Sequence, residues 1–156
     1  MVIVLEEKIL NNYRTIAIVR LSPDPERASY KVASYLIEHD YHIIPVNPQA
    51  HEILGRTSYA DLSSIPEPVE VVDIFRRAED VMPIVEKAIK IGAKAAWMQL
   101  GIINEEAVTK AKDAGLLVVT DKCMRKEHLR TSVEPAPMTT KSYVSAISYP
   151  CGLPYR

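Results

Sequence analysis

Short apolar segments rich in Val and Ile recur along the chain. They predict five strands, at residues 15–21, 42–47, 69–75, 94–100 and 116–120. Because most of these segments are continuously apolar rather than alternating, both faces of each strand are expected to be covered, as in a parallel sheet. Pro45 lies in the second strand and cannot donate a ladder hydrogen bond, so that strand is expected near an edge or distorted.

Amphipathic helical patterns lie between the strands. The first carries an apolar stripe along residues 28–37. The second, at residues 80–91, begins with acidic residues, ends with lysines and is followed by Gly92 as its C′ residue. The third begins at Asn104, a good N-cap, and ends at Gly115. Ordinary capping chemistry therefore delimits the predicted helices.

Strands that alternate with helices predict right-handed βαβ units. The expected fold class is α/β, a Rossmann-like open parallel sheet of five to six strands with helices on both faces. We expect the strand order 3-2-1-4-5, with a sixth strand as an addition. Residues 48–68 have little periodicity, and could hold a short edge strand and one helical turn.

The chain has 156 residues, which fits one domain, expected at residues 1–130 with an N-terminal helix at about 3–12. From Thr131 the pattern changes, because residues 131–156 contain four prolines and no sustained period. They predict an extended or mobile tail. Its apolar side chains also make it a candidate contact for the domain, a second copy of the chain or a partner protein.

The formal net charge of −1 gives no overall basic field, so nucleic-acid binding is not expected. Charged residues interrupt the N-terminal apolar segment, and no apolar run approaches membrane-spanning length. We therefore expect a cytoplasmic protein without membrane contact. The two cysteines, Cys123 and Cys151, form no disulfide framework or paired thiol motif, and are expected to be reduced.

In an open α/β sheet, ligands bind beyond the carboxyl ends of the strands. Five loops meet that condition, at residues 20–29, 47–51, 75–79, 99–104 and 120–125. The first lacks glycine altogether, and the second strand ends in Asn47 and Pro48 rather than in an acid. A dinucleotide-binding fingerprint needs glycines in the first turn and an acidic residue at the end of the second strand, and this chain has neither. A Walker loop is absent as well.

Cations gather at two of these loops. Three surround the first turn and two follow the third strand, namely Arg20, Arg27 and Lys31, then Arg76 and Arg77. The start of the first helix adds backbone N–H groups, and Ser22 and Ser29 add hydroxyls. This combination favours a ligand that carries phosphate.

Catalytic and metal chemistry find less support. Cys123, Glu127 and His128 are too few for a closed zinc site without further ligands, so no metal is expected. No nucleophile, base and orienting group emerges together from the five loops. We therefore expect no catalytic residue.

Three stretches of the sequence carry a resemblance to a known family. They are IAIVRLSPDPERASYKVASYLIEHDYHIIPVNP, VEVVDIFRRAEDV and AAWMQLGIINEEAVTKAKDAGLLVVTDKCMRKEH. Together they resemble the CoA-binding protein family, small stand-alone relatives of the nucleotide-binding domain in the succinyl-CoA synthetase alpha subunit. The resemblance covers about residues 13–128. VNP, VDIFRR, WMQLGI and D-K-C-M-x-x-E-H stand in the expected order at the strand ends.

The resemblance implies that the ligand is coenzyme A or an acyl-CoA. The first turn would contact the diphosphate, Asn47, Pro48, Phe75 and Arg76 would line the nucleotide, and Gln99 to Gly101 would approach the pantetheine arm. The residues expected to bind the cofactor are Arg20, Leu21, Ser22, Pro25, Arg27, Ser29, Asn47, Pro48, Phe75, Arg76, Gln99 and Gly101.

Two positions depart from the family's pattern. Arg20 stands where the family usually has glycine, which lets the backbone approach a phosphate. An arginine there either changes the turn or occupies a conformation that favours glycine. Asp40 replaces a common glycine at the end of the first helix, where aspartate tolerates left-handed geometry.

Three functional hypotheses follow. The leading one is a CoA-binding carrier, sensor or regulatory module without catalysis of its own. The first alternative is an enzyme, either a nicotinamide-dinucleotide-binding oxidoreductase or a component related to acyl-CoA synthetases. The second alternative is a scaffold or interaction domain that has lost ligand binding through Arg20.

Overall fold

The computed structural model describes residues 4–133. Within them, the helices are α1 (Leu5–Asn12), α2 (Ala28–Glu38), α3 (Val81–Lys90), α4 (Glu105–Asp113) and α5 (Met124–Val133). The main sheet contains β1 (Thr15–Val19), β2 (His42–Val46), β5 (Val71–Ile74), β6 (Ala95–Met98) and β7 (Leu117–Val119). A small hairpin contains β3 (Glu52–Ile53) and β4 (Arg56–Thr57), and two short 3-10 helices are η1 (Leu62–Ser64) and η2 (Ala78–Asp80).

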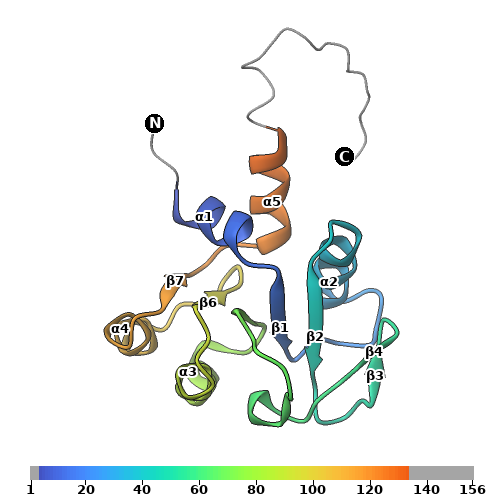
Figure 1. The fold of residues 1–156 in the computed structure, drawn as a ribbon, viewed down its shortest axis with the longest axis horizontal. Helices are drawn as coiled ribbons and strands as arrows, with labels where there is room; N and C mark the ends of the chain where they lie inside the picture. The colour runs from blue at the N-terminus through green and yellow to red at the C-terminus, as the bar shows by residue number, and fades with distance from the viewer. Residues whose placement is uncertain (1–3, 134–156) are drawn as a thin grey trace, which may run out of the picture.

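The main sheet is entirely parallel, with strand order β2-β1-β5-β6-β7. Helices cover both of its faces, with α1, α2 and α5 on one side and α3 and α4 on the other (Figure 1). The predicted α/β Rossmann-like fold is therefore confirmed. Every carboxyl end of the main sheet lies at the same edge, so the loops that follow the strands are brought together.

The predicted strand order needs a correction. The third long strand, β5, pairs with β1, whereas the order 3-2-1-4-5 placed it beside β2. Beside the other edge of β2, the segment around Tyr59 forms an isolated parallel bridge to Val46. Residues 48–68 instead form the β3–β4 hairpin and η1, and add no strand to the main sheet. The predicted order holds only if this segment is counted as the third strand.

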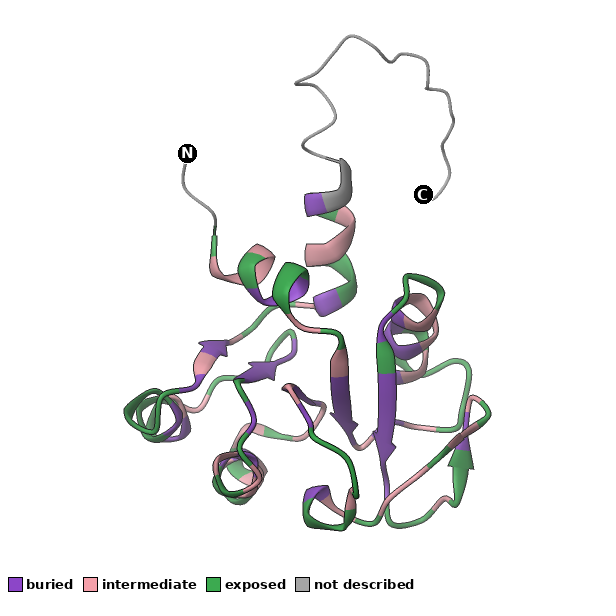
Figure 2. Cartoon of the chain, in the orientation of Figure 1, coloured by how far each residue is buried: buried purple, intermediate pink, exposed green. Residues whose placement is uncertain are grey.

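Strict alternation along the strands divides the core into two layers. Ile16, Ile18 and Trp97 point toward α1, α2 and α5, while Ala17 and Val19 point toward α3 and α4. Figure 2 shows that β1 is buried after its first residue, and the residues of β5 and β6 are all buried. Trp97 is fully buried and its indole N–H donates to the Lys122 carbonyl at 2.8 Å. This bond ties the core to the loop after β7.

The expected helix ends are confirmed at α3 and α4. The Asn104 carboxamide oxygen accepts a hydrogen bond from the Ala107 amide at 3.0 Å, as an N-cap should. Gly92 and Gly115 follow the two helices with positive φ angles of 81° and 95°. Asp40 likewise has φ 71° after α2, in line with the expectation that aspartate tolerates this geometry.

Helix α5 was not predicted, because its sequence lacks an apolar stripe. It packs against α1 and α2 and continues past residue 130, where the domain was expected to end. The predicted tail, from residue 134 onward, lies outside the described residues, and the division into domain and tail stays a prediction. No helix in the described part of the chain has the length and apolar character needed to cross a membrane.

Candidate functional site

Two cavities open at the carboxyl edge of the sheet, one on each face. The first has a volume of about 380 Å³ and lies between the ends of β1 and β2, the η1 segment and α3. The second has a volume of about 510 Å³ and lies between α2, the ends of β5 and β6, and the start of α5. Arg76 lines both, so the two cavities meet at the end of β5.

The first cavity combines apolar walls with balanced charge. Its apolar lining includes Val19, Val46, Pro48, Leu62, Pro83 and Ile84. Lys87 donates to Asp61 at 2.9 Å, and Arg76 donates to Asp80 at 2.8 Å. The hydrogen bond from Lys87 is the main reason that the pKa of Asp61 is lowered. A flat, largely apolar group with polar edges fits the apolar part of this cavity.

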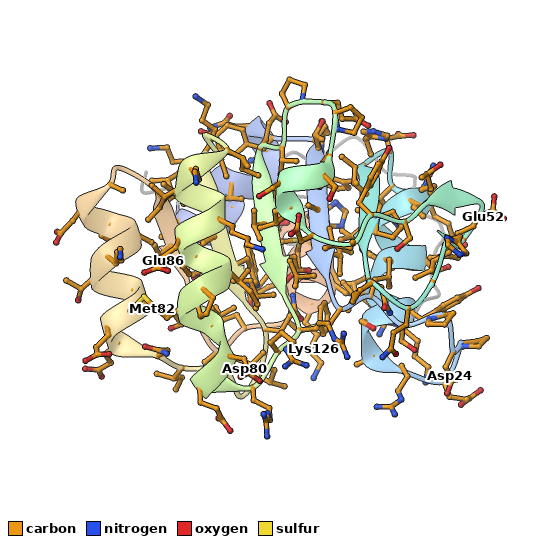
Figure 3. All side chains as sticks on the ribbon, turned by 90° about the horizontal axis from the view of Figure 1, so that it is seen from below. Asp24, Glu52, Asp80, Met82, Glu86 and Lys126 are labelled. Carbon is orange, nitrogen blue, oxygen red and sulfur yellow. The ribbon has the colours of Figure 1, made fainter. Side chains whose placement is uncertain are left out.

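The second cavity is strongly cationic. Its charged lining consists of Lys31, Arg76, Arg77, Arg125 and Lys126. Phe75, Gln99 and Cys123 complete the part nearest the sheet. In Figure 3 the labelled side chains of Asp80, beside Arg76, and Lys126 lie at the same edge of the molecule. An anionic ligand is therefore the chemical match for this cavity.

The first turn is built without glycine, yet it uses a glycine-like conformation. Arg20 has φ 70°, its amide donates to the Val46 carbonyl at 2.7 Å, and its side chain lines the first cavity. The left-handed region costs a residue with a Cβ atom about 1–2 kcal/mol. The turn therefore has the backbone conformation that glycine would give it, and the Arg20 backbone is strained.

Internal hydrogen bonds hold this turn in place. The Ser29 hydroxyl accepts from the Ser22 amide at 2.9 Å, and the Asn47 carboxamide donates to the Leu21 carbonyl at 2.9 Å. Leu21, Ser29 and Asn47 are all buried. Their side chains thus fix the turn to β2 and α2. No side chain caps the start of α2 at Arg27, so the first-turn amides of that helix face solvent or a ligand without a protein cap.

The other expected site residues divide between the two cavities and their surroundings. Pro48 lines the first cavity, while Phe75 and Gln99 line the second. Pro25 lines a separate hollow beside α2, so it stands apart from both. Gly101 has φ 84°, and its amide donates to the Asp121 carboxylate at 2.7 Å, which joins the loops after β6 and β7.

A buried carboxyl group lies beneath the second cavity and was missed by the sequence analysis. Asp73 is fully buried, accepts a hydrogen bond from Gln99 Nε2 at 2.7 Å through Oδ1, and leaves Oδ2 without a partner. Burial raises its pKa to about 8, although the Gln99 bond acts in the opposite direction. The available signal was a single carboxylate inside the apolar segment VEVVDIF.

Two of the residues considered as zinc ligands, Glu127 and His128, make contacts with other side chains. Glu127 pairs with Arg130 at 3.0 Å, and His128 is hydrogen-bonded to the Tyr35 hydroxyl at 2.7 Å. Burial, followed by the charges of His39 and Arg14, lowers the pKa of His128 to about 4. No cluster of three metal-ligating side chains occurs between residues 4 and 133.

Comparisons with known proteins found similar sequences and similar solved structures. The YneT protein of Bacillus subtilis (strain 168) is 36% identical over 125 residues, which are 80% of this chain and 93% of that protein. A solved structure, described as a hypothetical protein from Pyrococcus horikoshii OT3, is 46% identical with a TM-score of 0.78, covering 80% of this chain and 88% of that one.

A larger enzyme contains a similar part. The dinucleotide-forming acetyl-coenzyme A synthetase 1 of Ca. Korarchaeum cryptofilum is 26% identical with a TM-score of 0.63, over 71% of this chain and 26% of the synthetase. The sequence profile of the CoA binding domain matches residues 14–129, which include both cavities. The chain therefore belongs to the CoA binding domain family.

Proposed function

We propose that this protein binds coenzyme A or an acyl-CoA across both cavities, as a non-catalytic carrier, sensor or regulatory module in the cytoplasm. The observation that carries the proposal is the pair of cavities joined at Arg76, one apolar and charge-balanced, the other cationic. A ligand with a nucleoside at one end and phosphates in the middle matches that sequence of environments.

The proposal assigns each part of the cofactor to a part of the site. The adenosine lies in the first cavity against Pro48. The diphosphate lies between Arg20, Arg76 and the uncapped start of α2, where N–H groups and guanidinium groups both favour anions. The pantetheine arm runs through the second cavity past Phe75 and Gln99, toward Gly101.

The absence of catalysis is also part of the proposal. The carboxylates Asp61 and Asp80 of the first cavity are held by Lys87 and Arg76, so they are poorly placed to accept a proton from a ligand. The enzyme alternative that uses nicotinamide dinucleotides is disfavoured by Asn47. This residue stands where an acid would hold the ribose, and its carboxamide is occupied by Leu21 and Gln49.

Coenzyme A is expected to raise the melting temperature of the purified protein. Any ligand that binds only the folded state adds RT ln(1 + [L]/Kd), about 2.7 kcal/mol at a hundredfold excess over Kd. Thermal unfolding with and without millimolar CoA measures this shift, with NAD(H) as the comparison ligand. No shift with CoA would contradict the proposal, and a larger shift with NAD(H) would favour the enzyme alternative.

Arg20→Gly is expected to raise the free energy of unfolding by about 1 kcal/mol, because glycine adopts the left-handed conformation without a Cβ clash. Arg20→Ala is the matched control, since it removes the same side chain but keeps the clash. Urea unfolding measures both.

The same variant also tests the scaffold alternative by its CoA affinity. If that alternative is right, the wild type binds no CoA and Arg20→Gly gains strong binding. Our proposal expects wild-type binding and at most about a tenfold change.

A further inference from the structure

The lining of the second cavity contains cations and no carboxylate. Five cationic side chains line it and no carboxylate does, in a chain whose net charge is −1. The first cavity, by contrast, contains three cations and three carboxylates. This difference is local, because the two cavities share Arg76.

The five cations fall into two groups. Arg76 and Arg77 are paired with the carboxylates at the start of α3, Arg76 with Asp80 at 2.8 Å and Arg77 with Asp80 and Glu79 at 3.1 and 3.5 Å. The second group consists of Lys31, Arg125 and Lys126. Within residues 4–133 these three form no ion pair, and the Arg125 guanidinium lies over the Tyr35 ring at 5.7 Å.

Two members of the unpaired group lie on a different element from those assigned to the diphosphate. Arg125 and Lys126 belong to the first turn of α5, directly after Cys123, whereas the diphosphate is assigned to Arg20 and Arg76. Apolar side chains such as Phe75, Ile102 and the 60% exposed Leu100 line the same cavity. The cavity thus offers an apolar surface with positive charge at its α2 and α5 side. An aliphatic chain that ends in an anion would complement it.

This inference rests on the proposed function. We propose that the preferred ligand is a CoA thioester of a dicarboxylic acid, whose free carboxylate contacts Arg125 and Lys126. The methylene groups of such an acyl chain would pack on the apolar lining. The carboxylate would accept charge-assisted hydrogen bonds that an acyl chain without charge cannot form.

A matched pair of ligands tests the proposal. Glutaryl-CoA and valeryl-CoA have acyl chains of the same length and differ by the terminal carboxylate. Isothermal titration calorimetry of the full chain is expected to give at least about tenfold tighter binding of glutaryl-CoA, the value of one charge-assisted contact. Coenzyme A is titrated in parallel, because it reports the proposed function alone.

Variants locate the effect on α5. The double variant Arg125→Gln, Lys126→Gln is expected to bind glutaryl-CoA and valeryl-CoA equally, and to lose much less affinity for CoA than for glutaryl-CoA. Lys122→Gln is the control, since it removes an exposed cation that lies just before α5 and does not line the cavity. It should keep the preference for glutaryl-CoA. Melting temperatures without ligand verify that the variants are folded.

Two results would overturn the inference while the proposed function survives. One is equal binding of glutaryl-CoA and valeryl-CoA to the wild type, which needs no variant to be informative. The other is a loss of CoA affinity in the double variant as large as the loss of glutaryl-CoA affinity. That loss would assign Arg125 and Lys126 to the phosphates. A wild type that binds none of the three ligands would overturn both proposals.

Discussion

Replacing Asp73 with asparagine is expected to raise the free energy of unfolding strongly at pH 9 and to change it little at pH 4. In the folded protein burial raises the pKa of this carboxyl group from 3.8 to about 8. Between these values the folded chain retains a proton that the unfolded chain has released. Protonated Asp73 therefore makes its full contribution to the free energy of unfolding below about pH 4, and this contribution falls as the pH rises toward 8.

The size of this effect follows from the interval between the two pKa values. Roughly four pH units correspond to about 5 kcal/mol, an upper bound that is large beside the stability of an ordinary domain. Asparagine cannot ionise, and its carboxamide oxygen can still accept the Gln99 hydrogen bond. The variant should thus avoid most of the alkaline loss.

Urea unfolding at pH 5, 7 and 9, followed by circular dichroism, measures the difference. Asp113→Asn is the control, because it makes the same chemical change at an exposed position on α4. Parallel stability curves for the wild type and Asp73→Asn between pH 5 and pH 9 would contradict the prediction. They would mean that Asp73 ionises in the folded protein without penalty.

Arg76→Gln is expected to weaken CoA binding by about 10- to 100-fold, the value of a charge-assisted hydrogen bond to a phosphate. Arg76 is the residue that lines both cavities, and its side chain is 32% exposed. The substitution also leaves the Asp80 carboxylate without this partner, close to the proposed diphosphate. Its negative charge would add to the loss.

The adjacent arginine provides a matched control. Arg77 contacts the same Asp80 carboxylate, but its side chain is 71% exposed and lines only the second cavity. Arg77→Gln should therefore weaken CoA binding by less than about threefold, the value of an exposed, solvent-screened charge. Calorimetric titration of CoA into both variants compares them. Equal losses would contradict the assignment of the diphosphate to Arg76.

Most of the fold could be predicted from the sequence, because its pattern is dictated by local chemistry. Continuous apolar segments became the buried parallel strands, and Asn104 and Gly115 delimit α4 as ordinary capping residues. The strand order was harder, since pairing depends on contacts distant in sequence. The position beside β2 that was expected for the third strand is taken by the segment around Tyr59, which makes one bridge to β2. Helix α5 contains no apolar stripe, so only its packing on α1 and α2 reveals it.

The loops that border the candidate site could be predicted from the sequence, whereas only some of its charged residues could. The strand ends named in advance do border the two cavities, as the position of Pro48, Phe75 and Gln99 shows. Of the three unpaired cations only Lys31 was named in advance, because Arg125 and Lys126 reach the cavity only through the unpredicted α5. Asp73 looked like one polar residue in a strand. Its significance depends on three-dimensional burial.

Under the proposed function, the left-handed conformation of Arg20 sets the stability of the fold against ligand recognition at one position. Glycine would be the more stable residue there, yet it would remove a guanidinium group from the wall of the first cavity. Selection of variants for heat resistance alone should therefore enrich glycine or asparagine at position 20, whereas selection for binding should retain arginine. The residue at this turn would then record which of the two pressures acted on the chain.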